Sequence, residues 1–299
     1  MIQVDGLTRR YGHHTAVEDV SFRCEPGTVT GFLGPNGAGK STTMRMICGL
    51  TPPTAGRATI GGRAYRDLPN PGREVGVLLD AAAQHAGRTG RGVLVVAART
   101  MGVDVRHVDA ALARVGLNQV AARRRVRAYS LGMRQRLGLA YALLGDPRTL
   151  ILDEPANGLD PEGIFWMRGL LRDFADRGGT VLLSSHLLRE VEAVADRLVV
   201  IGGGRVVADG DRDELLAGAG TLVRAHDPAA LRTALTAAGL HPTSDTDGVL
   251  LVAAEAGAVG QVAADAGVAL TELRPADSGG LEQLFLSLTA GASVQEAVR

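Results

Sequence analysis

The sequence has 299 residues, which is enough for one large domain or two ordinary ones. Hydrophobic residues make up 45% of the chain and the formal net charge is zero, so the composition supports a packed core and disfavours a general nucleic-acid or anionic-membrane binder. No run of about 18 apolar residues without charge occurs, so the sequence predicts no membrane-spanning helix. Cys24 and Cys48 form neither a disulfide framework nor a metal-binding pattern, which is typical of the reducing cytosol.

The chain begins with two predicted strands, residues 2–8 and 15–24, separated by a polar turn. Tyr11 lies in this turn, just before the second strand. An aromatic ring in such a place is typical either of ordinary packing or of a platform on which a purine ring stacks. Tyr11 is therefore a candidate contact for a nucleotide base, and packing is the alternative.

A glycine-rich loop follows, between a predicted strand at residues 28–33 and a predicted helix at residues 42–50. It matches the pattern G-x-x-x-x-G-K-[ST], in the strand–loop–helix context in which this pattern binds phosphate. The glycines Gly34, Gly37 and Gly39 allow backbone conformations closed to other residues, so that successive N–H groups can turn inward on an anion at the positive end of the helix dipole. The candidate phosphate-binding residues are Gly34, Pro35, Asn36, Gly37, Ala38, Gly39, Lys40, Ser41 and Thr42.

Lys40 is the only lysine in the chain, against 31 arginines. Its ammonium is a mobile point charge for the outer phosphates of a nucleotide, whereas the bulky planar fork of Arg does not fit the same cradle. The hydroxyl of Ser41, the next residue, is a candidate ligand for Mg²⁺.

A predicted strand at residues 75–79 ends at Asp80, and the region from about 81 to 145 is predicted to be helical. Within that region the segment from 129 to 136 opens a helix, for which Ser130 is the predicted N-cap and Gly132 permits close backbone approach. The positive end of the helix dipole offers a second anion site there. The basic run at 123–127 is predicted to be a solvated face, with a phosphate or lipid contact as the alternative.

Two later strands bring polar side chains to one edge of a predicted parallel sheet. The strand at residues 148–152 ends in Asp153 and Glu154, and the strand at 180–184 is soon followed by His186. Asp153 is a candidate Mg²⁺ ligand, and Glu154 is a candidate base that polarises an attacking water. His186 is predicted to contact a γ-phosphate, with a satisfied core histidine as the alternative.

The last part of the chain, residues 219–299, is predicted to be a small α+β module without a catalytic constellation. We expect it to contact a partner or a second copy of the chain. The predicted strands are 222–225, 249–252 and 270–273, the predicted helices are 229–238, 259–266 and 281–288, and residues 243–248 are predicted to form a polar turn.

Taken together, these motifs resemble those of the ATP-binding subunits of ABC transporters, in the order and spacing of that family across roughly residues 1–215. The phosphate loop, the signature loop at 129–133, the second magnesium motif at 150–154 and the D-loop at 158–160 all match, as do Tyr11 and His186. The forms YSLGM and ILDEPANGLDP and the C-terminal module resemble bacterial drug and antibiotic exporters. The departures are Leu131 and Met133 in the signature, Ala156 before the D-loop, and Asp80 where the family carries Gln or Glu.

The resemblance implies an α/β P-loop NTPase core with an antiparallel edge subdomain, spanning residues 1–218 with a helical subdomain at about 81–145, followed by the α+β module. It implies ATP and Mg²⁺ as cofactors, with Asp80 beside Asp153 near the metal, and a homodimer in which Ser130 and Gly132 face the ATP bound to the other subunit. It also implies a separate transmembrane permease, no nucleic-acid partner, and a peripheral position on the cytoplasmic face of the membrane, where only the permease contacts lipid.

Two other classes remain open at this stage. The chain could be an ABC-type ATPase that acts on ribosomes or DNA, although such relatives usually carry two nucleotide modules or a long coiled-coil insertion, and the balanced charge disfavours a nucleic-acid surface. It could also be a regulatory subunit with weak hydrolysis, for which Asp80 is the one supporting residue in the sequence. Asp is one methylene shorter than Glu, so its reach toward the metal and the attacking water is reduced.

Overall fold

The computed structural model describes residues 1–185, 188–216, 220–244 and 249–275 of the chain. It divides into two compact units, of which one comprises Met1–Gly210 and the other begins at Asp211. The domain boundary predicted from the sequence lies after residue 218. Every candidate site residue that the structure describes lies in the first unit, so the description of the site concerns that unit alone.

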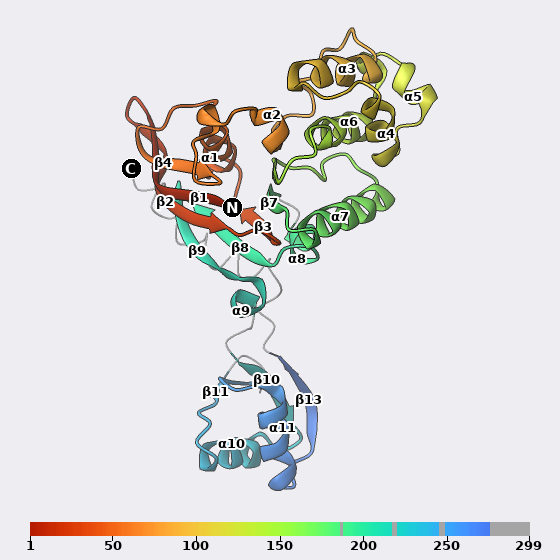
Figure 1. Ribbon diagram of the computed structural model, residues 1–299. Helices are drawn as coiled ribbons and strands as arrows, with labels where there is room; N and C mark the ends of the chain where they lie inside the picture. Colours follow the sequence, from red (N-terminus) through yellow and green to blue (C-terminus); the bar gives the residue numbers. More distant parts are fainter. Residues whose placement is uncertain (186–187, 217–219, 245–248, 276–299) are drawn as a thin grey trace. The chain divides into compact units, whose positions relative to one another are not determined.

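A six-stranded sheet in the order β5-β6-β7-β3-β8-β9 forms the centre of the first unit, as far as the structure describes it (Figure 1). Neighbouring strands from β5 to β8 pair in parallel, so their carboxyl ends meet at one edge. The central strands are buried along their whole length, as is typical of a parallel sheet covered on both faces. The strands are β3 (Val29–Leu33), β5 (Val75–Leu78), β6 (Thr149–Leu152), β7 (Thr180–Ser184), β8 (Arg197–Gly202) and β9 (Arg205–Asp211).

A smaller antiparallel sheet in the order β2-β1-β4 confirms the predicted antiparallel edge subdomain. Its strands are β1 (Ile2–Tyr11), β2 (His14–Cys24) and β4 (Ala55–Ile60), and β4 leads into two short helical turns, η1 (Tyr65–Asp67) and α2 (Pro71–Glu74). The structure places Tyr11 inside β1, paired with His14, and not in a turn. The prediction of a turn from residue 9 to 14 is wrong because β1 and β2 continue to pair until the tight reversal at Gly12.

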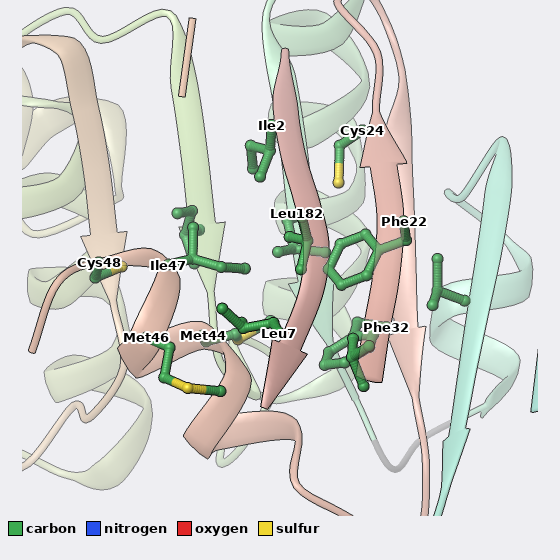
Figure 2. Close-up of a cluster of buried hydrophobic side chains, with 14 of the residues drawn as sticks. Ile2, Leu7, Phe22, Cys24, Phe32, Met44, Met46, Ile47, Cys48 and Leu182 are labelled. Carbon is green, nitrogen blue, oxygen red and sulfur yellow. The ribbon is translucent and has the colours of Figure 1, made fainter. Parts of the chain in front are cut away.

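One apolar cluster joins the two sheets to helix α1 (Lys40–Ile47), as Figure 2 shows. Ile2 and Leu7 come from β1, Met44 from α1, and the rings of Phe22 and Phe32 stack with centroids 5.2 Å apart and planes at 28°. A stacked pair of this kind contributes about 0.5–1.5 kcal/mol beyond its buried area. The cluster fixes α1, and with it the loop before α1, against the carboxyl edge of the large sheet.

The predicted helical insertion lies between β5 and β6 and forms a separate lobe (Figure 1). Side chains cap three of its helices: Thr89, Asn118 and Ser130 each accept a hydrogen bond from a backbone N–H in the first turn. Each of these helices begins directly after its capping residue, and the cap at Ser130 is the one predicted from the sequence. The arginines of the basic run at 123–127 are exposed, as predicted. The lobe contains α3 (Gly90–Met101), α4 (His107–Arg114), α5 (Gln119–Arg123), the turn η2 (Val126–Ala128) and α6 (Leu131–Leu143).

Two further helices complete the described part of the first unit. Helix α7 (Pro161–Asp176) begins at an Asp160 cap, whose carboxylate accepts from the Gly163 N–H at 3.0 Å. Its buried face packs against the large sheet. Helix α8 (Leu188–Glu192) follows β7. None of the helices in the described residues is long and apolar enough to cross a membrane.

The second unit has its own core, formed by apolar residues such as Val223, Leu231 and Val259. Its antiparallel sheet, in the order β11-β12-β10-β13, carries a β-α-β-β-α-β chain path. The predicted polar turn at 243–248 is wrong in its first part, because Thr243–Ser244 pair with Leu250–Leu251, and residues 245–248 and the helix predicted at 281–288 lie outside the described residues. The elements are α9 (Arg212–Leu216), β10 (Thr221–Ala225), α10 (Pro228–Ala237), β11 (Thr243–Ser244), β12 (Leu250–Val252), α11 (Ala256–Asp265) and β13 (Leu270–Pro275).

Candidate functional site

The glycine-rich loop joins the end of β3 to the start of α1. Gly39 is the N-cap of α1 with φ 105°, and a Cβ on it would lie 2.6 Å from the Ala16 carbonyl oxygen, so no other residue fits there. No side chain caps α1, which leaves the N–H groups of its first turn to a ligand. The helix starts at Lys40, two residues before the predicted start, because the loop runs directly into the first helical turn.

Lys40 is 7% exposed and its ammonium is held by the loop itself. Nζ donates to the carbonyl oxygens of Gly34 at 2.6 Å and of Pro35 at 3.2 Å. Burial lowers the pKa of this ammonium, and the negative charges of Glu154 and Asp153 act in the opposite direction. The charges of both acids therefore act on this ammonium. A ligand that brings negatively charged oxygens can replace the neutral loop carbonyls as its hydrogen-bond acceptors.

The remaining loop residues divide into an exposed tip and a buried base. Pro35, Asn36 and Gly37 are exposed, and Gly37 has φ 85°. Gly34 does not have a positive φ, and glycine is needed there because a Cβ would lie 2.5 Å from the Ile201 carbonyl oxygen. At the base Ala38 is buried, whereas Ser41 is exposed and Thr42 is half-buried at the start of α1.

Asp153 and Glu154 follow β6 at the carboxyl edge of the sheet and are half-buried. The buried Ser184 at the end of β7 donates its hydroxyl proton to Asp153 Oδ1 at 2.5 Å, and its oxygen accepts from the Glu154 N–H at 3.0 Å. Glu154 has φ 51°, an uncommon conformation for a residue other than glycine. The charges of Glu154 and Asp153 also act on Lys40, as described above, and their convergence with the phosphate loop stays a prediction.

The donor chemistry at this edge fits Mg²⁺. This ion keeps several waters and binds through one or two carboxylates together with substrate phosphates, so it needs few protein ligands. The Asp153 carboxylate and the Ser41 hydroxyl are the two protein donors predicted for such a set. The described part of the chain contains no cluster of three or more His, Cys, Asp or Glu side chains that would hold a metal without help from a substrate.

Asp80 lies just after β5, which pairs with β6 so closely that the Leu78 carbonyl oxygen accepts from the Asp153 N–H at 2.7 Å. Asp80 is exposed, and its carboxylate accepts from the Ala82 N–H at 2.7 Å. It also lines a groove of about 620 Å³ between α1, β5 and the helical lobe. The structure thus gives Asp80 a partner within its own turn, and its assignment to the metal stays a prediction.

The signature segment begins α6 as predicted. Ser130 is exposed, and its hydroxyl accepts from the Met133 N–H at 3.2 Å. A Cβ on Gly132 would lie 2.6 Å from the Gly158 carbonyl oxygen, and a Cβ on Gly158 would meet the Leu131 side chain. The close approach that Gly132 permits is therefore to the D-loop of the same chain.

Tyr11 and His186 complete the predicted set. The Tyr11 ring is 47% exposed, and the Arg9 guanidinium carbon lies 4.4 Å from its centroid. The guanidinium over one face of the Tyr11 ring accounts for the position of the ring without a nucleotide. The exposed part of the ring leaves room for a nucleotide base. His186 lies outside the described residues.

Three residues around the site do not follow from sequence motifs alone. Ser184 bridges the two acids, as described above, and the buried Gln135 of α6 donates its amide Nε2–H to the Glu154 carbonyl oxygen at 2.9 Å. Thr43 Oγ1 donates to the Gly39 carbonyl oxygen at 2.9 Å, which is the usual back-bond of a helical threonine. The order of the strands is what brings Ser184 beside β6, and no spacing pattern along the chain reveals it.

A family model described as "ABC transporter" matches residues 17–157, and one described as "Domain of unknown function (DUF8746)" matches residues 219–282. A bacitracin transport ATP-binding protein of Bacillus licheniformis is 39% identical over 218 residues, 72% of this chain and 71% of that protein. A lantibiotic transport ATP-binding protein of Streptococcus pyogenes is 36% identical over 71% of this chain and 92% of its own length. A daunorubicin resistance ATP-binding protein of Streptomyces coeruleorubidus is 40% identical over 73% of this chain and 71% of its own length.

Solved structures show the same fold. A structure titled as the ATP-binding subunit of an ABC transporter has a TM-score of 0.66 and 30% identity, covering 72% of this chain and 91% of that one. A dimeric ATP-binding cassette in a post-hydrolysis state, bound to ADP and Pi, has a TM-score of 0.65 at 20% identity, covering 71% of this chain and 98% of that one. At that identity the second likeness concerns the fold alone.

The first prediction concerns Lys40. Replacing it by Ala removes both the charge offered to the phosphates and the two bonds that close the loop, so we expect ATP affinity to fall by about tenfold to a hundredfold or more. Arg45→Ala is the matched control, because Arg45 is an exposed cation on the same helix. Equilibrium binding of ATP to the folded variants measures the effect. Unchanged affinity in Lys40→Ala would refute the assignment of the loop.

Proposed function

Because this chain belongs to the ABC transporter family of ATP-binding subunits, it binds and hydrolyses ATP, and we propose that two copies of it drive a separate permease that exports antibiotics, drugs or lipid-like compounds. The cargo class comes from the names of the relatives, which are bacitracin, lantibiotic and daunorubicin proteins. We place the subunit on the cytoplasmic face of the membrane, where it contacts lipid only through the permease and binds no nucleic acid.

The observation that carries the proposal is a buried ammonium, held by the loop carbonyls at the uncapped start of α1, on which the charges of two carboxylates act. Lys40 exchanges its bonds to the loop carbonyls for phosphate oxygens, while the N–H groups of α1 hold the same phosphates. Asp153 and Ser41 would hold Mg²⁺, which would supply positive charge beside the phosphates. Glu154 accepts the proton of the attacking water.

Two other residues complete the proposed nucleotide site. We assign Tyr11 to the base of ATP, since its exposed ring offers an aromatic face. We assign His186 to the γ-phosphate on the strength of its place after β7, the strand that also supplies Ser184. The hydrogen bond that Asp80 accepts from the Ala82 N–H gives it no role at the nucleotide, so its metal assignment rests on resemblance alone.

We propose that the dimer is head to tail, with Ser130 and Gly132 of each subunit facing the ATP held by the other. One chain carries every motif, which makes a symmetric homodimer the simplest assembly. Two observations support it: Ser130 caps α6 at an exposed position, and the neighbouring Leu131 is 53% exposed, a large apolar side chain left to solvent. A contact of the same surface with a second copy would cover both.

The groove beside Asp80 is the surface that we propose for the permease. It has a volume of about 620 Å³ and is walled on one side by the nucleotide-binding half and on the other by α3 and α6. Three large apolar side chains that line it are exposed: Leu50, Val96 and Tyr141. An apolar segment of the permease seated here would touch both halves, so a change at the phosphate loop would be transmitted to it.

The alternative of an ATPase that acts on ribosomes or DNA receives no support from the charge, because Lys+Arg and Asp+Glu both number 32. The relatives described above are transport or drug-resistance proteins and not translation or DNA-repair factors. The hypothesis of a weakly hydrolysing regulatory subunit is supported by Asp80 alone. The residues proposed for hydrolysis, Lys40, Asp153 and Glu154, are all present. Export is therefore the function that we propose.

The second prediction separates binding from chemistry. Glu154→Gln keeps the shape of the side chain and loses the base, so we expect ATP to bind as in the parent while turnover falls by roughly 10²–10⁴. ATP-bound dimers should accumulate, which size-exclusion chromatography with ATP would detect. Parental turnover in the variant would remove Glu154 from this role.

The third prediction tests the head-to-tail geometry. A Ser130→Arg subunit should fold and bind ATP, because an exposed helix N-terminus tolerates a larger side chain, but dimer closure and hydrolysis should fail. Mixed with Lys40→Ala subunits it forms heterodimers in which both defects fall on one composite site. The other site keeps an intact loop and an intact signature, so hydrolysis should return in the mixture. If controls show that heterodimers form and neither closure nor hydrolysis recovers, independent sandwiched sites are excluded.

The fourth prediction concerns the groove. Val96→Arg places a charge among its apolar side chains, and we expect less of the chain to sediment with the membranes of cells that produce it, with ATP binding unchanged. Val120→Arg is the matched control, because Val120 is an exposed valine of the same helical lobe outside the groove. Equal membrane association of the two variants would rule the groove out as the permease contact.

A further inference from the structure

The peptide group of Glu154 is held from two sides by side chains of different elements. Its N–H donates to the Ser184 hydroxyl of β7 at 3.0 Å, and its carbonyl oxygen accepts from the Gln135 amide of α6 at 2.9 Å. We propose that Ser184 and Gln135 are positioning residues that aim the Glu154 carboxylate at the attacking water, an inference that rests on the proposed catalytic role of Glu154.

The backbone of Glu154 needs such support. Its φ of 51° lies in the left-handed region, which a residue with a side chain occupies only when its surroundings hold it there. The direction of the Glu154 side chain follows from this conformation. If the backbone relaxed to an ordinary negative φ, the carboxylate would point elsewhere, although the chain around it could remain folded.

Ser184 ties Glu154 to Asp153. The residue is fully buried, and its single hydroxyl proton is committed to Asp153 Oδ1, so its oxygen is left to accept from the Glu154 N–H. One hydroxyl thus fixes the proposed metal ligand and the proposed base relative to each other. An apolar residue of similar size at this position would leave both groups without this partner.

Gln135 is not required merely to satisfy the Glu154 carbonyl, because that oxygen also accepts from the Asn157 N–H at 3.1 Å. The Gln135 side chain is 4% exposed, and among the described residues its Oε1 has no hydrogen-bond partner. A buried amide oxygen without a partner is unfavourable, and an apolar side chain would avoid this penalty. What glutamine offers there, and an apolar residue does not, is a second donor that directs the Glu154 peptide toward α6.

The experiment uses the full-length chain and compares Gln135→Leu and Ser184→Ala with Thr180→Val. Thr180 is the matched control: it is a buried hydroxyl residue at the other end of β7, bonded to the N-terminal amine at 3.0 Å. A positioning role predicts that kcat falls by roughly tenfold to a hundredfold in the two test variants while KM for ATP stays within about twofold, since the phosphate loop is untouched. Ser184→Thr, which retains the hydroxyl, should recover part of kcat.

A double variant distinguishes positioning from a general structural effect. If Gln135 acts through Glu154, adding Gln135→Leu to Glu154→Gln should not slow single-turnover hydrolysis further. Multiplied effects in the double variant, or a kcat in Gln135→Leu and Ser184→Ala equal to that of Thr180→Val, would overturn the inference. If Gln135→Leu does not fold, as thermal unfolding would report, Gln135→Met takes its place in the same double-variant test, because Gln135 is bonded to the Glu154 peptide and not to Asp153.

The outcomes also separate this inference from the proposed function. Parental hydrolysis in Glu154→Gln means that Glu154 is not the base, and the proposed role fails first. Slow hydrolysis in Glu154→Gln together with parental kcat in Gln135→Leu and Ser184→Ala leaves the role intact and refutes the positioning alone.

Discussion

The burial of one ammonium group is the interaction on which the rest of the site depends. Lys40 gives up most of its hydration, and the loop carbonyls of Gly34 and Pro35 together with the charges of Asp153 and Glu154 offset that loss. The loop, the start of α1 and the end of β6 must therefore keep their relative positions. The apolar cluster that packs α1 between the two sheets provides that rigidity (Figure 2).

The topology of the large sheet explains why so few residues suffice. Strands β3, β6 and β7 are consecutive in the sheet although far apart in the sequence, and each ends in residues that belong to the site. Parallel pairing delivers the three ends to one edge, so the loop, the two acids and Ser184 meet without any long connecting segment. The helical lobe then adds Gln135 from outside the sheet.

The sequence predicts the features that depend on local chemistry. The phosphate loop, the strand that ends in Asp153 and the cap at Ser130 all follow from residue types at fixed spacing, and the structure contains each of them. Contacts made across the fold could not be predicted. The left-handed backbone of Glu154 and its bonds to Ser184 and Gln135 depend on strand order and on the seat of α6. Gly132 could be predicted only in part. The sequence shows that the residue is small, but only the fold shows that its neighbour Gly158 requires it to be small.

The first turns of helix α6 carry two different contacts, and this has a consequence for the proposed dimer. The N-terminus of the helix, capped by Ser130, is open to a second subunit, while Gln135 on the same rigid helix grips the peptide of Glu154 in its own subunit. A helix transmits displacement along its axis with little loss, because its hydrogen-bonded turns do not compress. In the proposed dimer, a movement of Ser130 toward the neighbouring nucleotide would therefore also move the Gln135 side chain that holds the Glu154 peptide. Each subunit would then hydrolyse its own ATP only when the nucleotide of the other subunit is in place, and a single helix would impose that condition.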